Sequence, residues 1–171
     1  MNEKKTDILI IGLGLAGMTA AMAAAKNGKK VTILTKTKKP QSGNTPWAQG
    51  GIVYRGINDS PEKLKKDIMK AGAGHCWEEA VDHICNHGPR LVKEILLDTI
   101  QTEFNRERNS LKRVSEGAHS KPRVIYKADK TGKSIFDSFI SYLKTLENVE
   151  ILSNHIAIDL LTFSHHSTES T

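Results

Sequence analysis

The pattern Gly12-x-Gly14-x-x-Gly17 constrains this chain most, because an apolar run precedes it and an Ala-rich stretch follows it. A second apolar run spans residues 31–36, so the order is strand, glycine turn, helix, strand. In that context the three glycines form a dinucleotide-binding fingerprint. Gly12 allows the tight turn, Gly14 lets the backbone approach a pyrophosphate, and Gly17 lets the helix pack closely on the sheet. The phosphates would bind at the helix N-terminus. An ordinary glycine loop before a core helix would leave both apolar runs unexplained.

Length and charge narrow the class of protein. The chain has 171 residues, which is enough for one domain, and the order strand, glycine turn, helix, strand predicts an α/β domain with a parallel, Rossmann-like sheet. Its formal net charge is +6. The excess charge lies in short lysine clusters, which are consistent with a nucleic-acid patch or with a solvated surface. Because the clusters lack interleaved aromatic residues, we expect a solvated surface and no nucleic-acid partner. A charged N-terminus, short apolar runs and only two cysteines predict a cytoplasmic protein without a signal peptide or membrane span.

Hydrophobic periodicity and breaker residues predict the remaining elements. Ser60 and Pro61 start a helix that buries Leu64, Ile68 and Ala71. The further predictions, in chain order, are strand 7–11, helix 14–26 ending at Gly28, strand 31–35, polar loop 37–51, helix 77–86, a break at 87–89, helix 90–98 with Leu91, Ile95 and Leu96 inward, exposed connector 101–113, strand 124–126, a helix from 131 burying Ile135, Phe139, Leu143 and Leu146, and strands 149–152 and 155–161.

The chain closes on a polar run, residues 162–171, directly after a predicted strand. A doubly wound fold that starts in this way needs further strands. The run is therefore either the end of a fragment or a disordered terminus, and we expect a fragment.

Five potential metal ligands lie between positions 75 and 87, namely His75, Cys76, His83, Cys85 and His87. On one helix His83 and His87 share a face, whereas Cys85 points to the opposite side. Because no tetrahedral set converges, we predict no metal site here.

Three segments, residues 42–51, 116–120 and 128–132, make the chain similar to the succinate dehydrogenase/fumarate reductase flavoprotein family. The resemblance runs from the glycine turn to the final residues. It implies an FAD-binding domain over residues 1–171 that is the N-terminal part of a longer fold, without its capping and C-terminal helical domains. A fragment of that kind is expected to be inactive alone.

By this resemblance, residues 12–17 lie at the pyrophosphate of FAD, Lys36 at its adenosine end, and residues 44–51 around the flavin. Thr35-Lys36 replaces the acidic residue that binds ribose in NAD-dependent dehydrogenases, which disfavours that class. The implied cofactor-binding residues are Gly12, Leu13, Gly14, Leu15, Ala16, Gly17, Lys36, Asn44, Thr45, Pro46, Trp47, Ala48, Gln49, Gly50 and Gly51.

Asn44 stands where family members with covalent flavin carry a histidine, so the resemblance implies non-covalent FAD. Soluble fumarate reductases also lack that histidine. Asn44 therefore excludes the covalent relatives without choosing between the remaining ones.

Glu116 and His119 are the implied substrate-site residues. Within the family the resemblance is strongest to the branch that oxidises L-aspartate to iminoaspartate in NAD (quinolinate) biosynthesis, with oxygen or fumarate as acceptor and quinolinate synthase as a partner. Glu116 would orient the substrate, because a carboxylate can select an ammonium group; otherwise it is a surface acid. His119 either supports the substrate or packs under the loop. The alternatives are a fumarate reductase or succinate dehydrogenase flavoprotein subunit and a non-catalytic FAD-binding remnant.

Overall fold

The computed structural model describes residues 3–39 and 42–162. The chain divides into two compact units, one formed by residues 1–42 with 143–171 and the other by residues 43–142. We call them the first and the second unit and describe each by itself. The predicted polar tail lies outside the described residues except for Thr162.

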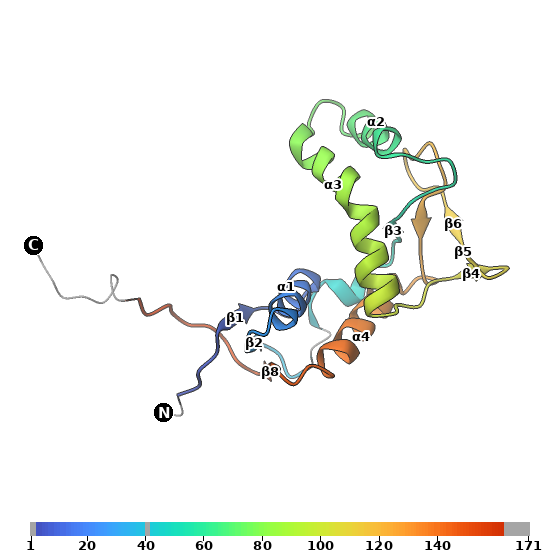
Figure 1. Cartoon of the computed structure of the whole chain (residues 1–171). Helices are drawn as coiled ribbons and strands as arrows, with labels where there is room; N and C mark the ends of the chain where they lie inside the picture. Colours follow the sequence, from blue (N-terminus) through green and yellow to red (C-terminus); the bar gives the residue numbers. More distant parts are fainter. Residues whose placement is uncertain (1–2, 40–41, 163–171) are drawn as a thin grey trace, which may run out of the picture. The chain divides into compact units, whose positions relative to one another are not determined.

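The first unit contains a three-stranded parallel sheet in the order β1-β2-β8 (Figure 1). Ile11 of β1 lies opposite Leu34 of β2, and Leu34 lies opposite Leu152 of β8. The predicted parallel sheet is confirmed. Its strands are β1 (Ile8–Ile11), β2 (Val31–Thr35) and β8 (Val149–Ser153).

Helix α1 (Leu15–Lys26) connects β1 to β2 and buries Met18 and Ala21, while β2 buries Val31 and Ile33. The helix ends as predicted: Gly28 has a φ of +73°, and its N–H donates to the Ala25 carbonyl at 2.9 Å. The Asn148 side chain fastens the start of β8 to this turn, donating to the Ala25 carbonyl at 3.0 Å and to the Lys29 carbonyl at 2.8 Å.

In the second unit, α2 (Pro61–Ala71) packs against α3 (Glu78–Leu91) (Figure 1). The predicted start of α2 is confirmed, because the Ser60 hydroxyl accepts a bond from the Lys63 N–H at 3.3 Å. Leu64 is buried as predicted, but Ala71 is exposed, and the buried position on the next turn is Asp67. A charged residue thus occupies the apolar face of α2.

The predicted break at residues 87–89 is wrong. Helix α3 runs through Pro89 and continues as a stretch of π-helix, η3 (Val92–Thr99). The buried side chains keep helical spacing across the proline, which explains why the helix does not end there. Leu91, predicted to face inward, is exposed. The buried residues of this stripe are Val81, Cys85, Pro89, Val92, Leu96 and Ile100.

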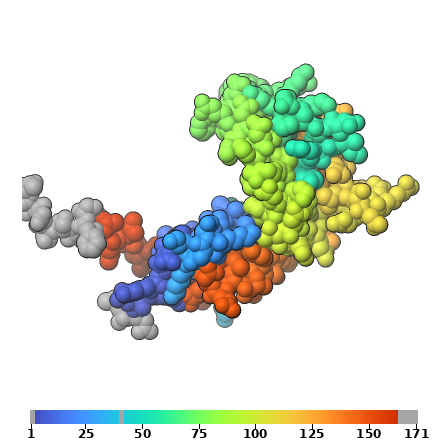
Figure 2. Space-filling model, viewed as in Figure 1, coloured from blue at the N-terminus to red at the C-terminus, as the bar shows by residue number. Residues whose placement is uncertain are grey.

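The predicted exposed connector 101–113 is wrong in part, because it contains short strands and the buried side chains of Thr102 and Phe104. A hairpin at residues 106–111 projects from the surface of its unit and is coloured yellow in Figure 2. A second small sheet has the order β3-β7-β6. The strands are β3 (Ile52–Val53), β4 (Arg106–Glu107), β5 (Ser110–Leu111), β6 (Arg113–Val114) and β7 (Val124–Ile125).

Helix α4 (Thr131–Leu143) buries Ile135, Phe139 and Leu143 as predicted. Leu146 follows the end of the helix and is only half-buried. The predicted strand 155–161 is wrong, because within the described residues this segment pairs with no other strand and its side chains are exposed.

Candidate functional site

The glycine turn of the first unit has the geometry that its pattern predicts. Gly12 has a φ of +108°, which side chains rarely adopt, and its N–H donates to the Leu34 carbonyl at 2.9 Å. A Cβ on Gly17 would lie 2.2 Å from the Gly12 carbonyl oxygen. The first turn of α1 therefore sits directly on the turn that leaves β1, and only glycine at position 17 allows this.

The turn shares its end of the sheet with Thr35 and Lys36. Because the strands are parallel, the carboxyl ends of β1 and β2 lie at one edge, where open α/β sheets bind ligands. The His155 N–H donates to the Thr35 carbonyl at 3.1 Å, which places the second residue after β8 at the same edge. Lys36 is exposed there.

These residues of the first unit fit a dinucleotide. Gly14 is the N-cap of α1, and no side chain caps the first backbone N–H groups of this helix. Its first turn also contains no acidic residue, so nothing there would compete with a bound phosphate. Leu13 is buried, so it contributes core packing while its backbone belongs to the turn. Leu15 is half-buried and Ala16 is exposed.

The predicted flavin loop, residues 44–51, belongs to the second unit and contains the short 3-10 helix η2 (Thr45–Trp47). The loop is tied to the start of α4, because the Gly132 N–H donates to the Ala48 carbonyl at 2.8 Å. A Cβ on Gly132 would lie 2.0 Å from the Thr45 carbonyl oxygen, so this approach also requires glycine. Gly51 packs on β7, where a Cβ would lie 2.1 Å from Cγ1 of Val124.

Most of the flavin loop is open. Trp47 is 75% exposed, and a Cβ on Gly50 would meet nothing within 4 Å. Thr45 and Pro46 are half-buried. The remaining exposed residues of the loop are Asn44, Ala48 and Gln49. Which of them contact FAD stays a prediction.

Glu116 and His119 lie on a single turn in the second unit. The His119 N–H donates to the Glu116 carbonyl at 3.2 Å, and Gly117 has a φ of +54° that reverses the chain. Both side chains line one pocket of about 590 Å³ against α2. Its lining residues are Asp67, Ile68, Ala71, Gly72, Cys76, Glu116, Gly117, Ala118 and His119.

Arg123 contacts this turn from the buried side, through His119. The sequence analysis did not single out Arg123 as a site residue. Its guanidinium is fully buried and binds Asp59 through two bonds of 2.8 Å. Nη1 donates to Oδ2 of Asp67 at 2.5 Å and lies 2.9 Å from Nδ1 of His119. Asp67 also accepts bonds of 2.8 Å from both the N–H and the hydroxyl of Ser120. We call Asp59, Asp67 and Arg123 the buried triad.

The triad keeps its charges. Burial raises the pKa of Asp67, but the bonds from the Ser120 N–H and the Arg123 guanidinium outweigh it and lower that pKa to about 2. The pKa of Asp59 is also lowered: burial opposes ionisation there, and the Arg123 and Gly56 bonds favour it more. The bond to Asp59 raises the pKa of Arg123. The Glu116–His119 turn therefore rests on fixed charges over the neutral pH range.

One signal in the sequence does point to the triad. Asp67 follows Leu64 by three residues, so both lie on the same face of α2. A carboxylate on an apolar face needs a cationic partner. Arg123 stands beside the predicted strand 124–126, but only the folded chain shows that the two meet.

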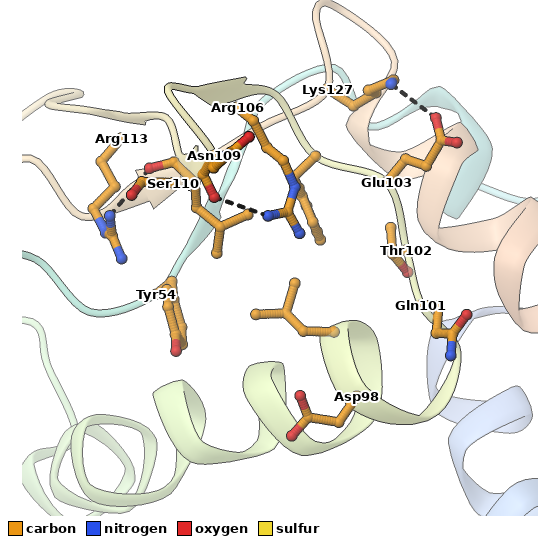
Figure 3. Close-up of a pocket in the computed structure, with 13 residues that line it drawn as sticks. Tyr54, Asp98, Gln101, Thr102, Glu103, Arg106, Asn109, Ser110, Arg113 and Lys127 are labelled. Atoms are coloured by element: carbon orange, nitrogen blue, oxygen red, sulfur yellow. Dashed lines mark hydrogen bonds and ion pairs between the residues drawn. The ribbon is translucent and has the colours of Figure 1, made fainter.

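A second pocket, of about 1010 Å³, lies between η3 and the hairpin (Figure 3). Figure 3 shows the Arg106 side chain reaching from the hairpin between Tyr54 and Thr102. The basic side chains that line this pocket already have partners. Lys127 pairs with Glu103 at 2.9 Å, Arg106 donates to the Asn109 carbonyl, and Arg113 donates to the Leu111 carbonyl. We therefore assign no ligand to this pocket.

The other predicted ligand candidates do not gather. The rings of His83 and His87 lie on an exposed face with centroids 4.7 Å apart and are tilted by 48° to each other, whereas Cys85 is buried. Within the described residues no group of three or more His, Cys, Asp or Glu could hold a metal ion. Over the same residues, no helix has the length and apolar character needed to span a membrane.

Comparisons with known proteins agree with this geometry. The chain is 40% identical over 157 residues to the L-aspartate oxidase of Halobacterium salinarum, covering 92% of this chain and 30% of that protein. It is 35% identical over 161 residues to the L-aspartate oxidase of Synechocystis, covering 94% and 28%. The chain thus spans less than a third of the length of these relatives.

Among solved structures, a quinol-fumarate reductase with menaquinol molecules matches with a TM-score of 0.84 and 25% identity, over 95% of this chain and 28% of the other. Residues 7–168 match the model of the FAD binding domain family. The glycine turn and the parallel sheet are consistent with this match. The chain is therefore a flavoprotein whose cofactor is FAD, and it belongs to the FAD binding domain family.

Proposed function

We propose that this chain serves in the FAD-dependent oxidation of L-aspartate to iminoaspartate. The observation that carries the proposal is the pocket that Glu116 and His119 share, in a chain 40% identical to an L-aspartate oxidase. When bound, FAD supplies the two-electron redox chemistry. We assign its pyrophosphate to residues 12–17, its adenosine end to Lys36 and its flavin side to residues 44–51.

In this proposal Glu116 selects the substrate. L-Aspartate differs from succinate by an ammonium group, and the exposed carboxylate of Glu116 can accept a charge-assisted hydrogen bond from it. The turn that carries Glu116 is fixed by the Ser120–Asp67 bonds of 2.8 Å, so little ordering is needed on binding. The apolar wall formed by Ile68 and Ala71 accommodates the carbon chain.

The same resemblance supports the wider setting that we propose, which is cytoplasmic NAD biosynthesis. Oxygen or fumarate would accept the electrons, and quinolinate synthase would receive the iminoaspartate. Asn44, which has no imidazole, would leave the flavin non-covalently bound.

Replacing Glu116 by glutamine tests the proposal, because it keeps the shape and removes the charge. In the complete, FAD-loaded protein that the resemblance implies, we expect kcat/KM for L-aspartate to fall by about ten- to hundredfold, which corresponds to the loss of one hydrogen bond to a charged group. Fumarate has no ammonium group, so its reduction should change little. Steady-state rates with both substrates measure the difference.

Glu107→Gln, a matched change on the exposed hairpin, should alter neither rate. Equal losses of both activities in the Glu116 variant would mean that Glu116 supports the fold or the flavin and does not select the substrate. No loss of either activity would make Glu116 a solvated surface acid and would refute the assignment.

A further inference from the structure

The buried triad does more than hold a loop, because Arg123 also contacts the His119 ring. Nη1 of Arg123 lies 2.9 Å from Nδ1 of His119, within hydrogen-bond distance. A guanidinium has only N–H donors and no acceptor. Nδ1 of His119 must therefore accept this bond and carry no proton.

This bond determines the tautomer of the ring. A neutral imidazole whose Nδ1 is an acceptor carries its proton on Nε2. Within the described residues Nε2 forms no hydrogen bond, and the ring lines the pocket that also contains Glu116. The outer end of the ring is thus a free N–H donor.

The guanidinium itself has little freedom. Two of its bonds hold Asp59 and a third holds Asp67, all at 2.5–2.8 Å, and the side chain is fully buried. Because a guanidinium is planar and rigid, these three bonds fix the direction in which Nη1 meets His119. The ring orientation is therefore set from within the fold.

We propose that Arg123 is a positioning residue that holds His119 as the Nε2–H tautomer, so that His119 donates a hydrogen bond to a carboxylate oxygen of the substrate. The inference rests on the proposed function for the identity of the substrate. It adds a donor to the acceptor that Glu116 supplies. One turn then presents both groups that bind an amino acid: a carboxylate that accepts a bond from the ammonium group and an N–H that donates to a carboxylate.

The tautomer can be observed without any turnover. In the chain labelled with ¹⁵N-histidine, long-range proton–nitrogen spectra distinguish the Nε2–H from the Nδ1–H form. The His119 signals are assigned by their loss in His119→Gln. We expect Nε2–H for His119, unchanged in Ser120→Ala, which removes one bond to Asp67 and leaves the Arg123–His119 bond. An Nδ1–H ring, or a mixture of both forms, would overturn the proposal.

Two substitutions at His119 then separate donation to the substrate from support of Arg123. Asparagine places its amide near Nδ1, where its oxygen can accept from Arg123, but it has no donor near Nε2. Glutamine places its amide near Nε2, where it can donate, but it leaves Arg123 without this acceptor. In the complete, FAD-loaded protein we expect His119→Asn to lower kcat/KM for L-aspartate by about ten- to hundredfold and His119→Gln by only a few-fold.

Stability should follow the reverse order, because asparagine keeps the contact with Arg123 and glutamine does not. Urea unfolding of both variants measures this. If activity instead follows stability, with asparagine the better substitute, His119 is a structural support and the proposal is wrong. Unchanged activity in both variants would also refute it. A failure of Glu116→Gln to alter substrate preference would refute the proposed substrate but leave the tautomer result standing.

Discussion

Replacing Arg123 by methionine is expected to destabilise the protein by about 3–5 kcal/mol, the cost of leaving buried charges without their partner. Arg123 is fully buried, and it is the cation that pairs with both Asp59 and Asp67. Methionine matches much of the arginine stem in volume, so loss of packing adds little. Urea unfolding followed by circular dichroism measures the change.

Arg106→Met provides the matched control, because this arginine is exposed on the hairpin and its side chain, among the described residues, donates only to the nearby Asn109 carbonyl. It should cost less than about 1 kcal/mol. Adding Asp67→Asn to Arg123→Met should restore part of the loss, since it removes a stranded charge. If the two arginine variants were equally stable, the buried triad would contribute nothing to folding.

The triad also gives the stability a defined acid dependence. Asp67 has a pKa of about 2 in the folded chain, below the ordinary value of 3.8 that it takes in the unfolded chain, so the unfolded state binds more protons between these values. Its contribution is complete above about pH 4 and is lost as the pH falls toward 2. Unfolding curves between pH 5 and pH 2 should show this loss in the native sequence and a smaller one in Asp67→Asn.

Adding a single methyl group at Gly17 is expected to weaken FAD binding strongly. The new Cβ would lie 2.2 Å from the Gly12 carbonyl oxygen, and this neighbour is backbone and cannot rotate away. The start of α1 must shift, and with it the amide groups proposed to hold the pyrophosphate. Overpacking of this kind costs about 1–3 kcal/mol. We expect the Kd for FAD to rise by about ten- to hundredfold, measured by quenching of flavin fluorescence.

Ala20→Ser is the control for this change, because it enlarges an exposed position on the same helix. It should leave both FAD affinity and thermal stability nearly unchanged. Should Gly17→Ala retain wild-type affinity, the glycine turn would be only a structural connection, and the proposed pyrophosphate site would have to lie elsewhere.

The parts of the fold that depend on neighbours in sequence were predictable. The turn at Gly12, the close packing at Gly17 and the stop at Gly28 each follow from a local backbone requirement, and the structure confirms all three. Pro89 shows the limit of such reasoning. As a local breaker it predicts a helix end, yet the buried stripe through Cys85 and Val92 maintains the helix across it.

Predictions that depend on distant partners were less successful. Residues 155–161 have a strand-like apolar pattern, but a pattern does not supply a neighbouring strand, and in the described residues none pairs with them. At the proposed site, Glu116 and His119 were predicted from the family resemblance of one short, continuous segment. Arg123 was missed because the carboxylates it binds come from the loop before α2 and from α2 itself.

The separation of those partners has a consequence for folding kinetics. The bonds of the buried triad join residues 64 and 56 positions apart, so they close large loops. Contacts of that range form after local helices and hairpins. We therefore expect the triad to form late in the folding of the second unit, so that its loss speeds unfolding more than it slows folding.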